Sequence, residues 1–170
     1  MTAYVALLRG VNLGKRQLKM DDLRRIAAEI GLESPSTYIA SGNLLFTSSK
    51  SEKALKNALE AALARHMGAS VGVMIRTAGE LVKVSSANPF ADSPPNYTVA
   101  IFLDEAPPGD AAKAAKNVDG ERIALGKREF YVHYPRGQGP SRLAIPAAAD
   151  GTARNMNTVA RLAELAMEME

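Results

Sequence analysis

The residues with the greatest capacity for chemistry form a short basic loop near the N-terminus, within the stretch GVNLGKRQLK. Guanidinium and ammonium groups bind carboxylate and phosphate, and an asparagine amide can donate a further hydrogen bond. The glycines on either side of Asn12 allow a tight turn that exposes backbone N–H groups. The stretch also precedes a predicted helix, whose first N–H groups favour an anion. We therefore expect an anion site that includes Arg9, Asn12, Lys15 and Arg16.

This loop differs from the phosphate-binding loop of nucleoside triphosphatases. The segment from Gly10 to Lys15 is one residue shorter than that motif, and Arg16 stands where a hydroxyl would bind magnesium. The sequence thus gives no support to a triphosphatase. A structural alternative stays open, in which the glycines only shape the turn and Lys15, Arg16 and Lys19 are solvated charges.

Three other polar segments are candidates for the same site. Ser41 and Asn43 flank Gly42 at the tip of a predicted hairpin, and Arg154 and Asn155 precede the last predicted helix. An asparagine there can cap the helix, so the pattern ARNMN fits either a cap or a ligand-binding arginine with one asparagine. The stretch HYPRGQGPSRL either becomes ordered on an anion or simply links two elements.

No catalytic constellation is visible, and the catalytic residues of any reaction stay unknown. His66 lies near the apolar face of a predicted helix, and His133 alternates with apolar residues on a predicted strand. Neither histidine has a neighbouring carboxylate in sequence. The absence of cysteine excludes disulfides, thiolate nucleophiles and metals bound through sulfur. We expect no metal and no cofactor.

The first half of the chain has a hydrophobic pattern that predicts the order strand, helix, strand, strand, helix, strand. The predicted segments are strand 3–9, helix 20–30, the hairpin strands 36–41 and 43–49, a helix that follows a capping box of Ser49 and Glu52 and ends before Gly68, and strand 70–76. This is the order of a ferredoxin-like unit, with both helices on one face of an antiparallel sheet. In that topology the basic loop and the hairpin tip emerge at the same end of the sheet.

The second half begins at the proline-rich segment NPFADSPPN, which interrupts regular structure. The predicted segments are strand 97–103, a short helix at 110–118, the hairpin strands 120–125 and 128–134, and an amphipathic helix at 156–169. We expect an α+β fold of two tandem ferredoxin-like halves, residues 1–78 and 79–170, whose antiparallel sheets carry helices on one face. The second half is expected to be incomplete, because no strand follows its final helix.

The amino-acid composition limits which classes of protein this chain can belong to. The 170 residues are 46% hydrophobic, which suffices to bury a real core. The first apolar stretch ends at Arg9, too early for a signal peptide or a membrane span, so we expect a cytoplasmic protein with no membrane partner. The 21 basic residues exceed the 18 acidic ones by only three, so an anionic small molecule or a nucleic acid is a permitted partner without being required. We expect a monomer or a homodimer.

Several of these segments together resemble DUF1697, a bacterial family of unknown function. The resemblance spans nearly the whole chain and is carried by ALLRGVNLGKRQLKM, TYIASGNLLF, RTAGEL, ANPF, FYVHYPRGQGPSRL and TARNMNTVARL. It implies that the signature polar positions of the family are Arg9, Asn12, Ser41, Asn43, Arg154, Asn155 and Thr158. Family members commonly carry tryptophan where this chain has Met156. The resemblance implies no reaction and no cofactor.

Three functions are compatible with these observations. The leading hypothesis is a protein that binds an anionic or phosphorylated ligand through the basic and asparagine-rich loops. The second is an enzyme that acts on a phosphorylated small molecule with an unidentified base. The third is a protein-interaction module whose open sheet face is covered by the other half or by a second copy. Sequence-specific RNA recognition is disfavoured, because the strands offer few aromatic platforms.

Overall fold

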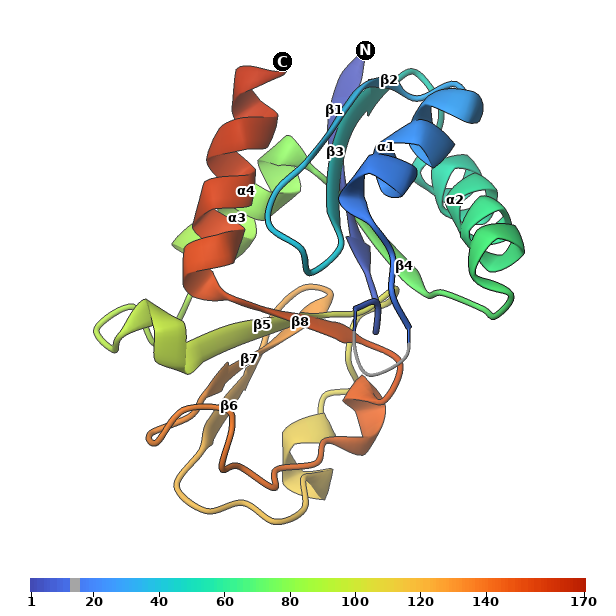
Figure 1. Cartoon of the computed structure of the whole chain (residues 1–170). Coiled ribbons are helices and arrows are strands. Elements are labelled where there is room, and N and C mark those ends of the chain that lie inside the picture. Colours follow the sequence, from blue (N-terminus) through green and yellow to red (C-terminus); the bar gives the residue numbers. More distant parts are fainter. Residues whose placement is uncertain (13–15) are drawn as a thin grey trace. The chain divides into compact units, whose positions relative to one another are not determined.

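The computed structural model describes residues 1–12 and 16–170 and has an α+β fold (Figure 1). The elements follow the order β1 (Thr2–Leu8), α1 (Met20–Glu29), β2 (Glu33–Thr37), β3 (Asn43–Ser48), α2 (Glu52–Met67), β4 (Val73–Thr77), α3 (Ala78–Ser86), β5 (Thr98–Phe102), β6 (Arg122–Leu125), β7 (Glu129–His133), β8 (Thr152–Asn155) and α4 (Met156–Glu168), with the short 3-10 helices η1 (Pro95–Tyr97), η2 (Ala111–Ala114) and η3 (Pro146–Ala148) between them. These elements form two compact units. One comprises Met1–Leu81 with Leu162–Glu170, and the other comprises Val82–Arg161.

The first unit contains a four-stranded antiparallel sheet in the order β2-β3-β1-β4. The hydrophobic strand predicted near the N-terminus is therefore central, with β3 on one side and β4 on the other. Its register pairs Val5 with Leu45 in β3 and with Arg76 in β4. This placement explains why every residue of β1 from Ala3 to Leu8 is buried.

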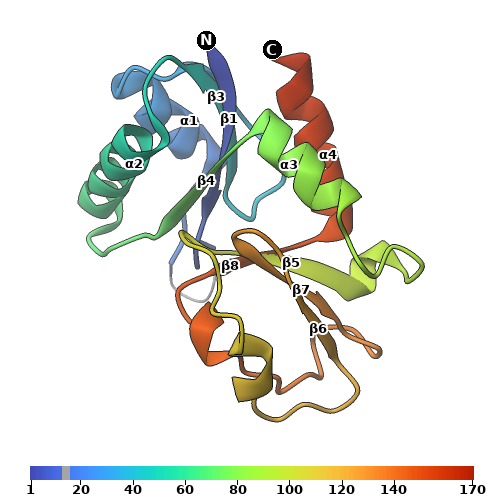
Figure 2. The same ribbon diagram turned by 180° about the vertical axis from the view of Figure 1, so that it is seen from behind.

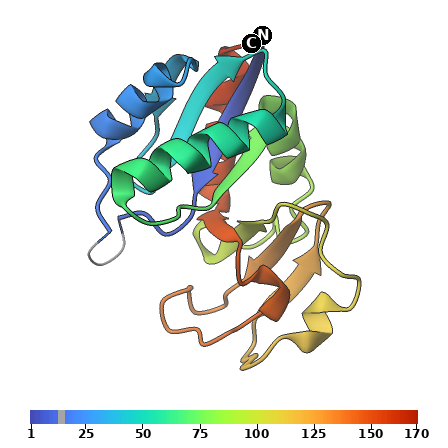
Figure 3. The same ribbon diagram turned by 90° about the vertical axis from the view of Figure 1, so that its right-hand side faces the viewer.

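Helices α1 and α2 cover one face of this sheet (Figures 2 and 3). Alternate strand residues such as Ala6, Phe46 and Ile75 share a hydrophobic core with residues of both helices. Within that core Ile26 of α1 is 4% exposed and Leu59 of α2 is fully buried. The helical spacing of apolar residues in the sequence therefore predicts the buried faces of both helices correctly.

The opposite face of the same sheet is also apolar and buried. Its residues include Val5, Leu7 and Leu45, each at most 1% exposed. The segment Leu162–Glu170, which includes the second half of α4, belongs to this unit and lies on that face (Figures 1 and 3). The sheet is therefore covered on both faces, which explains why β1 is a continuous apolar run and does not alternate.

The second unit contains another four-stranded antiparallel sheet, in the order β6-β7-β5-β8 (Figure 1). Numbered from the first strand of each sheet, both sheets have the same strand order. One face of the second sheet packs on a hydrophobic core that includes Val99, Phe130, Val132 and Ile145. The 3-10 helix η2 contributes Ala111 to this core.

Two predicted segments of the second half differ from the structure. The sequence analysis looks for a fourth strand after the final helix, but the fourth strand is β8 (Thr152–Asn155), which precedes that helix, pairs with β5 and completes the sheet. The predicted helix at 110–118 is only the 3-10 helix Ala111–Ala114. It stops there because Lys116 leaves helical geometry to form a backbone bridge with Ala144, with N···O distances of 2.8 and 3.0 Å.

The hairpin of the first half also differs in its first strand. Strand β2 covers residues Glu33–Thr37, several positions earlier than the predicted segment 36–41. The chain leaves the sheet after Thr37 because Ile39 adopts a left-handed conformation with φ of 53° and is 51% exposed. An isoleucine at positive φ is uncommon, and the alternation in the sequence gives no sign of it.

Candidate functional site

The end of β1 is tied to two neighbouring loops of the first unit. The backbone N–H of Leu8 donates to the Gly42 carbonyl, and the N–H of Arg9 donates to the Gly72 carbonyl, both at 2.9 Å. The chain then turns through Gly10, whose φ is 68°. The basic loop therefore begins between the β2–β3 turn and the α2–β4 loop.

Asn12 fixes this loop against the β2–β3 turn. Its side-chain amide donates to the Ala40 carbonyl at 2.5 Å, and its side-chain oxygen accepts from the Leu18 N–H at 2.7 Å. Asn12 itself adopts a left-handed conformation, with φ of 59°. Asparagine tolerates this region better than most residues, because its short polar side chain can bond to nearby backbone. The prediction that the basic loop and the hairpin tip lie together in space therefore agrees with this geometry.

The hairpin tip is held by its own polar residues. Asn43 is fully buried, and its amide donates to the Tyr38 carbonyl at 3.0 Å and to the Ser41 hydroxyl at 2.9 Å. Gly42 has φ of 86°, and a Cβ atom there would lie 2.7 Å from Val11 Cγ2. Only glycine therefore fits at the tip. Asn43 serves the turn and does not present its side chain to solvent.

The arginines of the loop lie on the α2–β4 loop. Arg16 Nη2 donates to the Ser70 carbonyl at 2.8 Å, and the exposed Arg9 packs its Cβ and Cδ beside Gly72. Within residues 1–12 and 16–170, Arg16 Nε is buried without a hydrogen-bond partner. Lys15, which the sequence also places in the site, lies outside the described residues.

The second unit contains the other two predicted site residues. Arg154 in β8 is 8% exposed, and its Nη1 donates to the Thr152 hydroxyl at 2.7 Å and to the Ala153 carbonyl at 2.9 Å. Burial lowers the pKa of its guanidinium to about 10. The sequence leaves open whether Arg154 contacts a ligand or has a structural role, and in the structure its side chain is buried on a strand that the sequence does not predict.

Asn155 acts as the cap of α4. Its side-chain oxygen accepts from the Thr158 N–H at 2.9 Å, which satisfies one of the free amides at the start of the helix. Of the two roles that the sequence leaves open for this asparagine, the observed contact matches capping. A joint cluster of Arg154 and Asn155 with the N-terminal loop stays a prediction.

The two histidines lie in different environments. His66 Nε2 is 3.8 Å from the carboxylate of Asp22 on the neighbouring helix, a carboxylate that sequence proximity does not reveal. The His133 ring lies 3.4 Å from the Thr98 hydroxyl and is tilted against Phe90, with ring centroids 6.1 Å apart. Over residues 1–12 and 16–170, no group of three or more histidine, cysteine or acidic residues could hold a metal ion. No helix within these ranges is long and apolar enough to cross a membrane.

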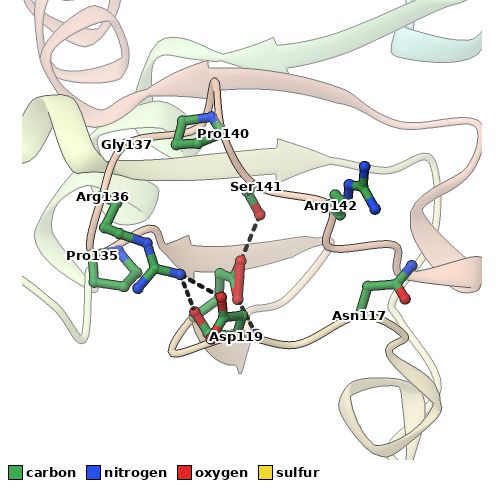
Figure 4. A pocket seen from close by; sticks show the side chains of 9 residues that line it. Asn117, Asp119, Pro135, Arg136, Gly137, Pro140, Ser141 and Arg142 are labelled. Carbon is green, nitrogen blue, oxygen red and sulfur yellow. Dashed lines mark hydrogen bonds and ion pairs between the residues drawn. The ribbon is translucent and has the colours of Figure 1, made fainter.

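The second unit contains a surface pocket, and the sequence does not indicate that residues 117–121 form one of its walls. The loop 135–142, which the sequence leaves open as an anion-ordered stretch or a simple linker, packs against residues 117–121 and forms with them a pocket of about 140 Å³ (Figure 4). The available signal is the turn-forming pattern NVDG, in which Asn117 and Gly120 both have positive φ.

Two antiparallel sheets with flanking helices and polar loops define an α+β protein without a recognisable reaction centre in its described residues. The family model for the protein of unknown function DUF1697 matches residues 1–131, and the chain belongs to this family. No curated protein matches the sequence. A similar solved structure is that of the conserved bacterial protein SP0830 from Streptococcus pneumoniae, which shares 24% identity and has a TM-score of 0.81. That match covers 98% of this chain and 99% of the other, and it supports the fold alone.

Proposed function

We propose that this protein binds a phosphate-bearing ligand at the end of its first sheet, through the rim formed by residues 9–12, 16–19, 38–43 and 68–72. The observation that carries the proposal is the charge of these converging segments. In the sequence, residues 9–12 and 16–19 contain three basic and no acidic side chains, and the segments 38–43 and 68–72 contain no acidic side chain either. The rim therefore holds an excess of positive charge although the chain as a whole is nearly balanced.

The state of Arg16 supports an anionic ligand. A buried guanidinium N–H without an acceptor is costly, and such a group in a native protein calls for an explanation such as a bound ion. Arg16 Nη2 donates a hydrogen bond to the Ser70 carbonyl, and Arg16 Nη1 lies near Gly10. An anion seated at the turn would give the remaining donors an acceptor.

The start of α1 offers a second contact for the same ligand. Lys19 occupies the N-cap position and provides no side-chain hydrogen bond to the first turn. A shallow depression of about 470 Å³ opens beside it, lined by Asn12, Gln17, Leu18, Lys19, Met20, Asp21 and Ala40. The carboxylate of Asp21 is paired with Arg24, which reduces its repulsion of an incoming anion. Helix N–H groups and Lys19 together favour phosphate over a neutral ligand.

The identical strand orders of the two sheets support a finer description of the fold. We infer that each half is a ferredoxin-like unit, with the first ending near residue 78. In the second unit the 3-10 helices η2 and η3 occupy the chain positions of the two crossover helices. Loops at the ends of such sheets are common places for binding sites.

The experiment is a binding titration with inorganic phosphate, a nucleoside monophosphate and a fluorescent single-stranded oligonucleotide at several salt concentrations. Arg9→Gln and Arg16→Gln should each weaken binding by about tenfold, the loss of one charge-assisted contact. Lys53→Gln, which removes an exposed charge at the start of α2, is the matched control and should bind as the unaltered protein does.

The three ligands distinguish the source of the phosphate. Binding of the oligonucleotide alone, with a steep salt dependence, would indicate a nucleic-acid surface. Binding of the monophosphate with weak salt dependence would indicate a small-molecule site. Equal loss of binding in Lys53→Gln, or no binding of any of the three ligands, would refute the proposed rim.

A further inference from the structure

The second unit contains a small pocket that the proposed phosphate site does not use. It lies between residues 117–121 and the loop 135–142 (Figure 4). Its cavity volume is about 140 Å³. A pocket of this volume suits a small ligand such as an amino acid.

The pocket is built on one buried carboxylate. Glu121 is 9% exposed, accepts from the Ser141 hydroxyl at 2.6 Å and accepts from the Asp119 N–H at 2.5 Å. The Ser141 hydroxyl in turn accepts from the Leu143 N–H at 3.2 Å. These bonds join the two walls of the pocket, so the stretch that the sequence leaves open as a flexible linker is fixed in place.

The hydrogen bonds to Glu121 also set its charge. The bond from Ser141 and then those from backbone amides lower the pKa of the Glu121 carboxyl, so it is ionised at neutral pH. Asp119 pairs with Arg136 at 2.6 Å. With Arg142, the pocket lining holds two carboxylates and two guanidinium groups and is neutral overall.

The net charge of the pocket lining is unevenly distributed, because Arg136 is paired with Asp119 and the adjacent Glu121 adds a negative charge on that side. Arg142 and Asn117 lie on one side, whereas Arg136 and Asp119 lie on the other, with Ser141 between them (Figure 4). Arg142 is exposed, and within residues 1–12 and 16–170 it makes no ion pair. One side thus offers hydrogen-bond donors to an anionic group, and the other side offers carboxylates to a cationic group.

We propose that this pocket binds a small zwitterion of the α-amino acid class, with its carboxylate on Arg142 and Asn117 and its ammonium group on the carboxylates of Glu121 and Asp119. A phosphate dianion would leave the neutral pocket with two uncompensated negative charges beside Glu121. A zwitterion leaves it neutral and satisfies both sides. A bidentate contact from Arg142 fits a planar carboxylate.

The test measures binding of the standard amino acids at millimolar concentration by amide chemical-shift changes in the ¹⁵N-labelled full chain. At least one amino acid should saturate, with shifts concentrated in residues 117–121 and 135–142. Propionate, which lacks the ammonium group, and ethylamine, which lacks the carboxylate, should bind about tenfold more weakly or not at all.

Two variants test whether Arg142 and Asn117 donate hydrogen bonds to the carboxylate of the ligand. Arg142→Gln removes the guanidinium from an exposed side chain, and Asn117→Gly removes the amide while permitting the positive φ of 59° at that position. Each should weaken the amino acid by about tenfold, whereas Lys127→Gln in the β6–β7 turn should not. Phosphate binding at the first unit should be unchanged in all three variants, so failure of one proposal is separable from failure of the other.

Three results would overturn the proposal. They are the absence of binding by every amino acid in the series, equal binding by propionate, and full affinity in Arg142→Gln.

Discussion

Asn12 and Asn43 each use a side-chain amide to hold a turn of the backbone, and Asn155 uses its side-chain oxygen to cap α4. Their partners are carbonyl, hydroxyl or N–H groups within the same unit, at 2.5 to 3.0 Å. A glycine-rich turn leaves backbone groups without partners, and a nearby asparagine can satisfy them. The polar signature of these loops is therefore in large part a structural device, and the cations around it are the better candidates for ligand contact.

The first prediction at this scale concerns Asn43. Asn43→Ala should lower the free energy of unfolding by about 1–3 kcal/mol, because the Tyr38 carbonyl loses a donor in a buried turn. Ser41→Ala is the matched control and should cost less, since Ser41 is exposed whereas Asn43 is fully buried. Urea denaturation measures both. Equal stability of Asn43→Ala and the unaltered protein would show that the buried bond contributes nothing.

A second prediction concerns Tyr131 and alkaline pH. Its hydroxyl donates to the Val84 carbonyl at 2.7 Å, and burial raises its pKa from 10.0 to about 12. The folded state therefore holds this proton more tightly than the unfolded state. Stability from this group is complete below pH 10 and is lost as pH rises toward 12, by up to about 2–3 kcal/mol.

Tyr131→Phe isolates this effect. The variant should be less stable at neutral pH, because the Val84 carbonyl loses its donor, and the gap to the unaltered protein should shrink between pH 10 and 12. Denaturation curves of both proteins at stepped pH provide the measurement. Parallel pH profiles would contradict the raised pKa.

The sequence identifies the polar residues of the turns but not the exposure of Arg154. Asn12 lies between Gly10 and Gly14, and Asn43 follows Gly42, local patterns that predict a turn by themselves. Arg154 lies in TARN, a strand of only four residues in which alternation is too short to recognise. Its burial depends on pairing with β5, a contact between residues that are far apart in the chain.

At the scale of elements, a side-chain cap marks the start of α2 and of α4. Helix α2 begins after Ser51, whose hydroxyl accepts from the Ala54 N–H at 3.2 Å, two residues later than the predicted capping box at Ser49. The consecutive serines and the lysine before Glu52 permit several caps, and the sequence alone does not choose among them. Gly68 ends the helix in a left-handed conformation, as glycine commonly does.

The cap of α4 provides the third prediction. Asn155→Asp should keep the stability of the protein, because a carboxylate also accepts from the Thr158 N–H and interacts well with the helix start. Asn155→Ala should cost about 1 kcal/mol. Thermal unfolding of the two variants compares them directly. If both lose stability equally, the amide has a role other than capping.

The packing of α1 and α2 provides the fourth prediction. Ile26→Ala and Leu59→Ala should each lower the free energy of unfolding by about 2–5 kcal/mol, because both side chains are buried in the same core. Leu125→Ala is a control on the edge strand β6, where the side chain is 37% exposed, and should cost much less. Near-neutral effects at Ile26 and Leu59 would be incompatible with the observed core.

At the scale of the whole molecule, the order of elements in the first half could be predicted, and that of the second half only in part. The first half has strongly periodic helices and apolar strands, which are local signals. In the second half the crossovers are 3-10 helices of three and four residues, too short to produce helical periodicity. The repeated strand order is therefore visible in the topology and not in the sequence.

The boundaries between the two units fall inside helices. One lies between Leu81 and Val82 in α3, and the other lies between Arg161 and Leu162 in α4. The first unit therefore depends on residues from the end of the chain, and a cut near the middle of the sequence does not separate two complete domains.

This dependence leads to the last prediction. A chain that ends at Arg161 lacks the apolar side chains of Leu162, Ala163 and Ala166, each at most 5% exposed. Its first sheet then presents an uncovered apolar face to water. Loss of these contacts should lower the melting temperature by at least about 5 °C and should increase binding of a hydrophobic dye.

The matched control is a chain that ends at Glu168, the last residue of α4. It removes only Met169 and Glu170, so its melting temperature and dye binding should equal those of the full chain. Calorimetry of the three chains measures the effect of each truncation. An unchanged transition in the chain that ends at Arg161 would mean that the second half of α4 adds nothing to the first unit. We expect a lower melting temperature only for the chain that ends at Arg161, because Val5, Leu7 and Leu45 are buried on the face of the sheet where this helix lies.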